Sequence, residues 1–217
     1  MGKRRPVNNL IGLAVLATLY QRPMHPYEIA KILKATGKEH DMSLKWGSFY
    51  TVIGNLEKHG LIAGVESSRS GNRPERTTYR ITDEGREELV DWVRELVSLP
   101  RPEESGFRAG LSVLPVLHPD EATALLRQRA ERLETRLAAD RAEIDAMRGR
   151  VPRLFLIESE YDFALIQAEI DWIRALADEF AAGTFPDLEG WRVAHETGEV
   201  PPEMAALYEQ EGQPGPQ

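Results

Sequence analysis

The chain has 217 residues, of which 41% are hydrophobic, and this length allows one large domain or two small ones. It contains no cysteine, which excludes a disulfide framework and a thiolate metal site. No apolar run reaches the roughly 18 residues that a membrane span needs, so we expect a cytoplasmic protein without a membrane partner.

The net charge of −8 is spread unevenly along the chain. Residues 1–82 hold 13 Lys and Arg against 6 Asp and Glu, a balance of +7, whereas residues 83–217 hold 14 against 29, a balance of −15. Because phosphates attract basic surfaces and repel acidic ones, only the first part is suited to nucleic acid. The sequence therefore predicts a molecule of two parts, one basic and one acidic.

The basic part begins with two predicted helices. Asn8 and Asn9 are candidate N-caps for the first, which covers about residues 9–21. Pro26 suits the first turn of the second helix, and the apolar spacing that follows places Tyr27 on its buried side.

The third predicted helix, residues 48–60, has two contrasting faces. Its apolar stripe follows helical spacing and consists of Phe49, Val52, Ile53 and Leu56. Ser48 is its candidate cap, and Gly54 on the opposite face lets the helix approach a groove wall closely. That face can donate hydrogen bonds to phosphates and base edges through Ser48, Tyr50, Thr51, Asn55 and Lys58. Taken alone, it is equally compatible with an ordinary solvated helix.

A hairpin and a further helix complete the basic part. Residues 61–65 and 77–82 are predicted strands, joined by a turn over 68–76. Thr82 then caps a helix that runs to about residue 98. Three helices followed by a hairpin predict a winged helix-turn-helix, whose third helix enters the major groove. The turn would lie against a minor groove or flanking phosphates through Arg69, Arg73 and Arg76.

The acidic part contains two long predicted helices with heptad-like seams. The first seam consists of Leu126, Ala130, Leu133, Leu137, Asp140, Ile144, Met147 and Val151, and the second of Phe163, Ile166, Ile170, Ile173, Ala177 and Phe180. Such seams need apolar partners, so we expect these two helices to pack against other helices. Asp140 either fixes the register of this pairing or faces water. From Gly183 onward we expect irregular structure with Trp191 as its one large anchor.

Three segments resemble the PadR family of bacterial transcriptional regulators: LIGLAVLATLYQRPMHPYEIAKIL, WGSFYTVIGNLEKHGLI and RPERTTYRITDEGREEL. The resemblance covers about residues 8–98 closely, and residues 105–182 resemble more loosely the C-terminal domain of the longer members. It implies a homodimer that represses transcription by binding near-palindromic operators in double-stranded promoter DNA. Many members release DNA on binding a small, often aromatic, effector. Carried over to this chain, the resemblance makes Arg73 to Arg76 the wing, and the recognition-helix positions Ser48, Tyr50, Thr51, Asn55 and Lys58. Gly54 departs from the usual bulkier residue of the family.

The expected fold is mainly α, with a winged helix-turn-helix DNA-binding domain at residues 1–98. A dimerisation and effector domain of antiparallel helices follows at residues 99–183, and an irregular tail covers residues 184–217. Four aromatic residues either line an effector pocket between the two parts or simply pack in the core: Trp92, Tyr161, Phe163 and Trp172.

Catalytic and metal-binding patterns are not expected. The five histidines are far apart in the sequence and none has a helix-spaced partner, so we expect no metal site. No phosphate loop, nucleophile elbow or HExxH motif occurs, so we expect neither a cofactor nor an enzyme. The alternative to a DNA-binding regulator is a winged-helix module that docks an acidic protein partner on the same basic face.

Overall fold

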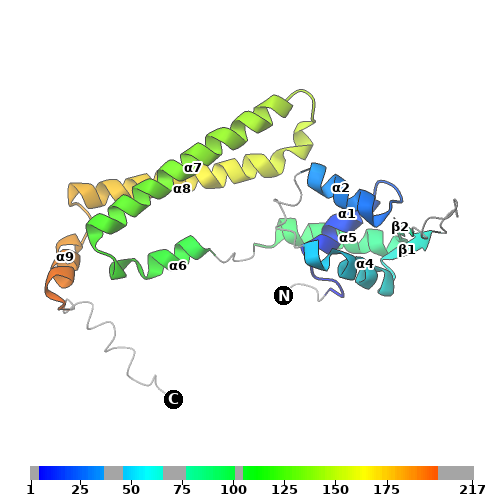
Figure 1. The fold of residues 1–217 in the computed structure, drawn as a ribbon, viewed down its shortest axis with the longest axis horizontal. Helices are drawn as coiled ribbons and strands as arrows, with labels where there is room; N and C mark the ends of the chain where they lie inside the picture. The colour runs from blue at the N-terminus through cyan, green and yellow to red at the C-terminus, as the bar shows by residue number, and fades with distance from the viewer. Residues whose placement is uncertain (1–4, 37–45, 66–76, 101–104, 200–217) are drawn as a thin grey trace, which may run out of the picture. The chain divides into compact units, whose positions relative to one another are not determined.

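The computed structural model describes residues 5–36, 46–65, 77–100 and 105–199. The chain divides into two compact units, Met1–Glu103 and Glu104–Gln217. Both are built mainly from helices, and the described part of the N-terminal unit also contains a two-stranded sheet (Figure 1). The predicted mainly α class is therefore confirmed.

The N-terminal unit has the element order of a winged helix-turn-helix. Its elements are α1 (Leu10–Leu19), α2 (Pro26–Ala35), the 3-10 helix η1 (Trp46–Ser48), α4 (Phe49–Lys58), β1 (Ile62–Val65), β2 (Thr78–Ile81) and α5 (Asp83–Ser98). The two strands are antiparallel, with Ile62 opposite Ile81 and Val65 opposite Thr78. Helices α2 and α4 form the helix-turn-helix, and the hairpin forms the wing.

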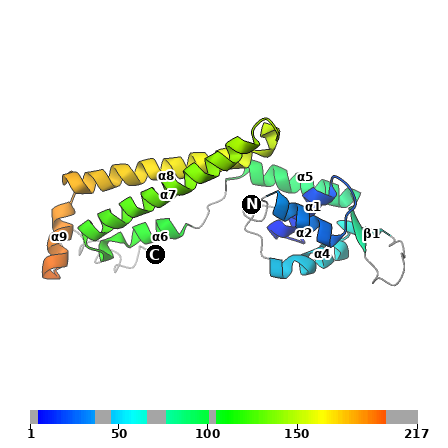
Figure 2. The ribbon, with the colours of Figure 1, turned by 45° about the horizontal axis from the view of Figure 1, so that its top comes forward.

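Helix α1 is the centre of this unit. Its side chains are almost all apolar, and Ile11, Val15, Leu16 and Leu19 are at most 2% exposed. A helix that is apolar all round is stable only when other elements cover it. Helices α2, α4 and α5 all contact α1, which lies between α5 and α4 in Figure 2. Their apolar stripes therefore face α1, and their polar faces remain outside.

The base of the hairpin is fixed to the helices on either side of it. Thr82 accepts a hydrogen bond from the Gly85 amide at 3.0 Å, which caps α5, and donates its hydroxyl to the Gly60 carbonyl at 2.7 Å. At Gly85 an added Cβ atom would lie 2.0 Å from the Leu61 carbonyl oxygen, so a larger residue does not fit. The end of α4, the start of β1 and the start of α5 are thus held together.

The helix caps agree only in part with the sequence prediction. Asn9 caps α1, because its side chain accepts the Ile11 amide at 2.8 Å. Ser48 occupies the N-cap position of α4 but makes no capping hydrogen bond with its side chain. His25 caps α2 in a reciprocal arrangement with Glu28, which the sequence pattern missed because histidine is not among the preferred N-caps.

The C-terminal unit contains a long helical hairpin. Its elements are α6 (Gly106–Ser112), the 3-10 helix η2 (Leu114–Val116), α7 (Pro119–Met147), the 3-10 helix η3 (Arg153–Phe155), α8 (Ile157–Ala182) and α9 (Leu188–Thr197). Near the start of α7, the Arg127 guanidinium lies 3.9 Å from the Asp178 carboxylate near the end of α8. Further along α7, Arg141 donates a hydrogen bond to the Gln167 side-chain oxygen, earlier in α8, at 3.4 Å. These cross-contacts show that α7 and α8 are antiparallel.

The two seams predicted from the sequence pack against each other inside one chain. Their buried cluster contains Leu126 and Ala130 from α7 and Ile173, Ala177 and Phe180 from α8. Asp140 is only half-buried, and its carboxylate lies 3.3 Å from Arg136 on the same helix. Because the seams already cover one another, a second chain would have to use a different face.

The tail departs from the prediction, since Leu188–Thr197 form α9 rather than irregular structure. Gly183, at φ +69°, ends α8, and the chain then turns into α9. The rings of Phe185 and Trp191 then lie edge-on to Phe180, with centroids 4.8 and 5.6 Å away. Helix α9 is therefore held by tertiary contacts, as the prediction of Trp191 as an anchor suggested.

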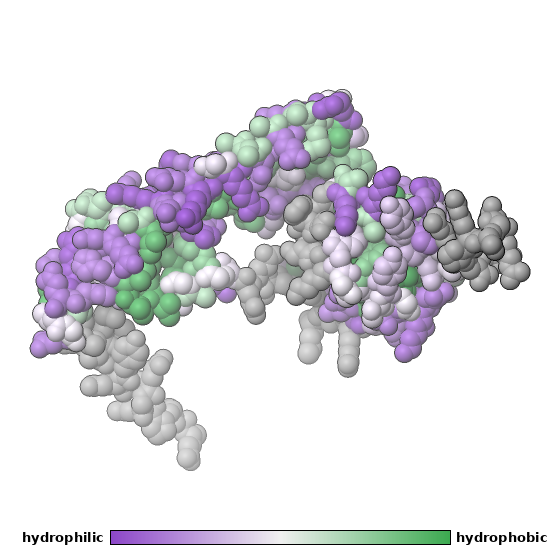
Figure 3. Space-filling model, in the orientation of Figure 1, coloured by the Kyte–Doolittle hydropathy of each residue, from purple (hydrophilic) through white to green (hydrophobic). Residues whose placement is uncertain are grey.

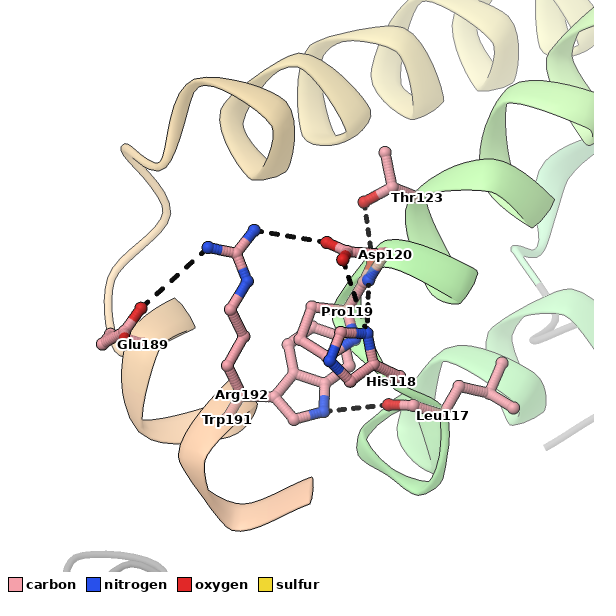
Figure 4. A network of polar contacts seen from close by, with 8 residues as sticks. All are labelled: Leu117, His118, Pro119, Asp120, Thr123, Glu189, Trp191 and Arg192. Atoms are coloured by element: carbon pink, nitrogen blue, oxygen red, sulfur yellow. Dashed lines mark hydrogen bonds and ion pairs between the residues drawn. The ribbon is translucent and has the colours of Figure 1, made fainter. Parts of the chain in front are cut away.

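Polar contacts also join α9 to the start of α7, as Figure 4 shows. The indole N–H of Trp191 donates to the Leu117 carbonyl at 3.0 Å. Arg192 pairs with Asp120 in the first turn of α7 at 3.2 Å. These contacts come from residues more than 70 positions apart, so a local pattern could not predict them.

The helices of the described part are too short or too polar to span a bilayer. Even the long helix α7 is mostly hydrophilic on the face visible in Figure 3.

Candidate nucleic-acid interface

Helix α4 has the two faces that its sequence predicts. Phe49, Val52, Ile53 and Leu56 are buried in the core of the N-terminal unit. On the other side Tyr50 is 68% exposed, and Thr51, Asn55 and Lys58 are exposed as well, while Ser48 is half-buried. The polar side chains of this helix are therefore free of the core and accessible to another molecule.

Gly54 lies on the same exposed face. No atom lies within 4 Å of the place where its Cβ would be, so internal packing does not require a glycine there. Glycine in a helix interior costs about 1 kcal/mol relative to alanine. The fold of this unit alone does not account for that cost.

Helix α2 presents a second exposed stripe that the sequence analysis missed. Tyr27, Lys31 and Lys34 are all exposed and are spaced four and three residues apart, so they lie on one side of the helix. Tyr27 is 68% exposed, which shows that its predicted place on the buried side was wrong. The spacing of Tyr27 with the two lysines was the available signal.

A chain of ring contacts brings this stripe to the start of α4. The Lys34 ammonium lies 4.8 Å from the centre of the Trp46 ring. The ring centroid of Trp46 lies 5.3 Å from that of Phe49, and the ring centroid of Phe49 lies 5.4 Å from that of Tyr50. The first turn of α4 contains no acidic residue, so the positive end of its dipole is not neutralised locally.

The acidic residues of α2 and α4 are engaged in contacts inside the unit. Glu28 accepts the His25 amide at 3.0 Å and lies 3.7 Å from Arg22. Glu57 accepts a hydrogen bond from the Tyr79 hydroxyl at 3.2 Å. Burial raises the pKa of Tyr79 above its ordinary value, and the charge of Glu57 and this hydrogen bond raise it further.

Arg5 does not contribute to an exposed basic surface, although the charge count from the sequence included it. Its side chain is 3% exposed and is ion-paired with Glu88 and Glu95 of α5. The arginines predicted at the wing tip, Arg69, Arg73 and Arg76, lie outside the described residues.

The four aromatic residues considered for an effector pocket have different surroundings. Trp92 is 3% exposed in the core of the N-terminal unit. Tyr161 and Trp172 are exposed on α8, and Phe163 is half-buried there. Trp172 contacts the ring of Phe107 with centroids 6.2 Å apart. Their role in effector binding stays a prediction.

The structure brings together two histidines that are far apart in the sequence. The rings of His118 and His195 are 5.7 Å apart, and His195 Nε2 lies 2.9 Å from the Pro115 carbonyl. Within the described ranges, however, no group of three or more His, Cys, Asp or Glu residues could hold a metal ion.

Taken together, the fold and the exposed faces of α2 and α4 define a winged helix-turn-helix protein. Residues 15–91, which lie within the N-terminal unit, match the model of the Transcriptional regulator PadR-like family. This match covers residues of the N-terminal unit alone, which is therefore similar to these transcriptional regulators. Among curated proteins, no sequence matches this chain.

Solved structures of similar fold cover most of the chain. Bacillus subtilis PadR in complex with operator DNA is 18% identical, with a TM-score of 0.64, over 79% of this chain and 99% of that one. Its complex with p-coumaric acid is also 18% identical, with a TM-score of 0.64, over 80% of this chain and 99% of that one. The Vibrio cholerae virulence activator AphA is 21% identical, with a TM-score of 0.58, over 79% of this chain and 98% of that one.

The contact between Tyr79 and Glu57 should make stability depend on pH in the alkaline range. A raised pKa means that the folded state holds its proton more tightly, so the stability it contributes is complete below about pH 10 and is lost as pH rises further. Urea denaturation between about pH 8 and 11 should therefore show wild type losing more stability than Tyr79→Phe. The control is Tyr27→Phe, whose ring is exposed; a wild-type curve parallel to that of Tyr79→Phe would contradict the assignment.

Proposed function

We propose that the chain acts as a homodimer that binds double-stranded promoter DNA sequence-specifically and represses transcription, and that a small aromatic molecule releases it. The observation that carries this proposal is the exposed face of α4, with Tyr50, Thr51, Asn55 and Lys58 opposite a fully buried stripe. The operator complex of the structural neighbour PadR supports operator DNA as the partner.

Helix α4 is the recognition element in this proposal. In helix-turn-helix proteins the second helix lies in the major groove and its N-terminal residues contact base edges. Tyr50, Thr51 and Asn55 would supply the base and sugar-phosphate contacts, and Lys58 would bind a phosphate further along the helix. Ser48 would contribute at the start of the helix.

Helix α2 would position the protein on the backbone. The first helix of the motif crosses the sugar-phosphate chain. Lys31 and Lys34 are exposed on one side of α2, and Lys34 lies close to the ring of Trp46 directly before α4. Contacts of Arg69, Arg73 and Arg76 from the wing stay a prediction.

An apolar stripe on α8 is the proposed dimer surface. Its members are exposed, recur every three or four residues and include no charged side chain: Ile157, Tyr161, Leu165, Ala168, Trp172 and Ala175. The stripe extends from Ile157 to Ala175, which corresponds to about 27 Å of helix. A second copy suits it, because a two-fold axis pairs a stripe with itself and brings no like charges together.

The proposed effector is a small aromatic acid. The p-coumaric acid complex of the structural neighbour supports this class of ligand. In this chain Arg129 lies 4.0 Å from the ring centre of Phe107, which also contacts Trp172. Arg129 also pairs with Glu169 at 2.6 Å, so the rings of Phe107 and Trp172 would supply the contacts to an aromatic ligand.

Substitutions on α4 should separate base contacts from phosphate contacts. On the promoter fragment upstream of the chain's own gene, Tyr50→Ala should reduce affinity about 10- to 100-fold, with a smaller loss on unrelated DNA. Lys58→Ala should weaken binding to all sequences and lower the salt slope by about one per protomer. Arg132→Ala, which removes the same charge from exposed α7, is the control. Unchanged affinity and slope in both α4 variants would exclude this helix as the contact surface.

Gly54 gives a test in which stability and binding change in opposite directions. Because a Cβ at this position meets no atom, Gly54→Ala should stabilise the free protein by about 0.5–1 kcal/mol. If the helix backbone approaches a groove wall here, the same methyl group should weaken operator binding. Thermal denaturation and a binding titration measure the two effects, and binding at wild-type strength would rule out the close approach.

The α8 stripe can be tested by placing one charge on it. Leu165 is 50% exposed, so Leu165→Glu should leave the helices intact but weaken the dimer at least about 100-fold, because a carboxylate would be buried in an apolar interface. Operator affinity should fall with it, since the two half-sites are then bound independently. Val193→Glu on α9, where Val193 is 44% exposed, is the matched control. Sedimentation showing an unchanged dimer would assign the interface to another surface.

A further inference from the structure

The segment before α1 is attached to α5 by a buried arginine. Arg5 Nη1 pairs with Glu88 and Nη2 with Glu95 at 2.6 Å, while the guanidinium carbon lies 5.2 Å from the centre of the Trp92 ring. Glu88, Trp92 and Glu95 follow one another at spacings of four and three residues, so they form one side of α5. The guanidinium therefore spans two turns of this helix.

The same segment reaches the back of the recognition helix. Val7 is buried in the core, and a Cβ added at Gly12 of α1 would lie 2.9 Å from Val7. The same point is 3.7 Å from Val52 and 3.8 Å from Leu56, both on the buried side of α4. The segment from Arg5 to Val7 thus connects the side of α5 that carries Trp92 with the buried side of α4.

We infer that residues 5–9 form a strap that sets the direction of α4 relative to α5, with Arg5 as its positioning residue. The inference rests on the proposed function, in which two copies of α4 read two half-sites at a fixed separation. Helix α5 is the last element of the N-terminal unit before the segment that leads to the C-terminal unit. An error in the angle between α4 and α5 would therefore displace each recognition helix from its half-site.

The strap requires an arginine rather than any cation. A guanidinium group presents several N–H donors in a planar fork and binds two carboxylates at once, whereas an ammonium group is a compact point charge. Burial alone would lower the pKa of Arg5, but hydrogen bonds and charges from Glu88 and Glu95 outweigh it and hold the pKa above its ordinary value. Arg5 therefore stays charged wherever the protein is folded and cannot act as a proton switch.

The test measures how strongly binding depends on half-site spacing. The probes are duplexes built from the half-site that the full-length protein selects from a random-sequence pool, placed as inverted pairs with spacers of −2 to +2 base pairs. Each base pair moves one half-site by about 3.4 Å and turns it by about 35°. The variants are Arg5→Met and Arg5→Lys, and the control is Arg94→Met, which removes an exposed arginine from the same helix.

Wild type and Arg94→Met should prefer one spacing at least 10-fold over its neighbours. Arg5→Met should bind the preferred spacing about 10-fold more weakly than wild type. It should prefer that spacing over its neighbours by no more than about 3-fold, and Arg5→Lys should lie between wild type and Arg5→Met in both respects. The salt slope should not change, because Arg5 contacts no phosphate in this assignment. Arg5→Lys keeps a cation beside both carboxylates and serves as the test if Arg5→Met does not fold.

Four results would overturn the strap. An equal loss at all spacings would show that Arg5 only stabilises the unit, and a salt slope lower by about one per protomer would show that it binds a phosphate. An unchanged spacing preference in both variants would remove the positioning role while leaving the proposed function intact. A wild-type protein that selects no sequence would overturn the proposed function and the strap with it.

Discussion

Helix α1 has apolar side chains on every side, so it is stable in water only when other elements surround it. Helices α2, α4 and α5 provide this cover, each with one apolar face. The buried stripe of α4 is consequently fixed by α1, and the opposite stripe, with Tyr50 and Lys58, has to face outward. The exposed face of α4, which we propose contacts DNA, is thus determined by the burial of α1.

Much of this arrangement was predictable because it depends on local spacing. The stripe Phe49, Val52, Ile53 and Leu56 identified both the core side and the exposed side of α4, and the glycine at position 60 marked its end. The hairpin and the Thr82 cap followed from turn and capping chemistry. Tyr27 was misplaced because an aromatic residue was counted as core, whereas its hydroxyl-bearing ring lies beside exposed lysines on α2.

Features that depend on distant residues were not predictable from spacing. The two heptad seams indicated long helices, but their pattern could not distinguish pairing within a chain from pairing between chains, and α7 and α8 pair with each other. Helix α9 and the His118–His195 contact follow the turn at Gly183 and join residues far apart in the sequence. Arg5 was counted as an available cation, since neither Glu88 nor Glu95 is near it in sequence.

If the N-terminal unit binds DNA as proposed, the locked base of the hairpin affects which DNA sequences it selects. Thr82 bonds to Gly60, and Gly85 abuts Leu61, so the hairpin cannot change its angle to α4 without breaking both contacts. Because the angle between the hairpin and α4 would then be fixed, the DNA duplex would have to bend to fit the protein. Selectivity would then arise in part at base pairs that no side chain touches, where flexible steps bend at little cost and stiff A-tracts resist.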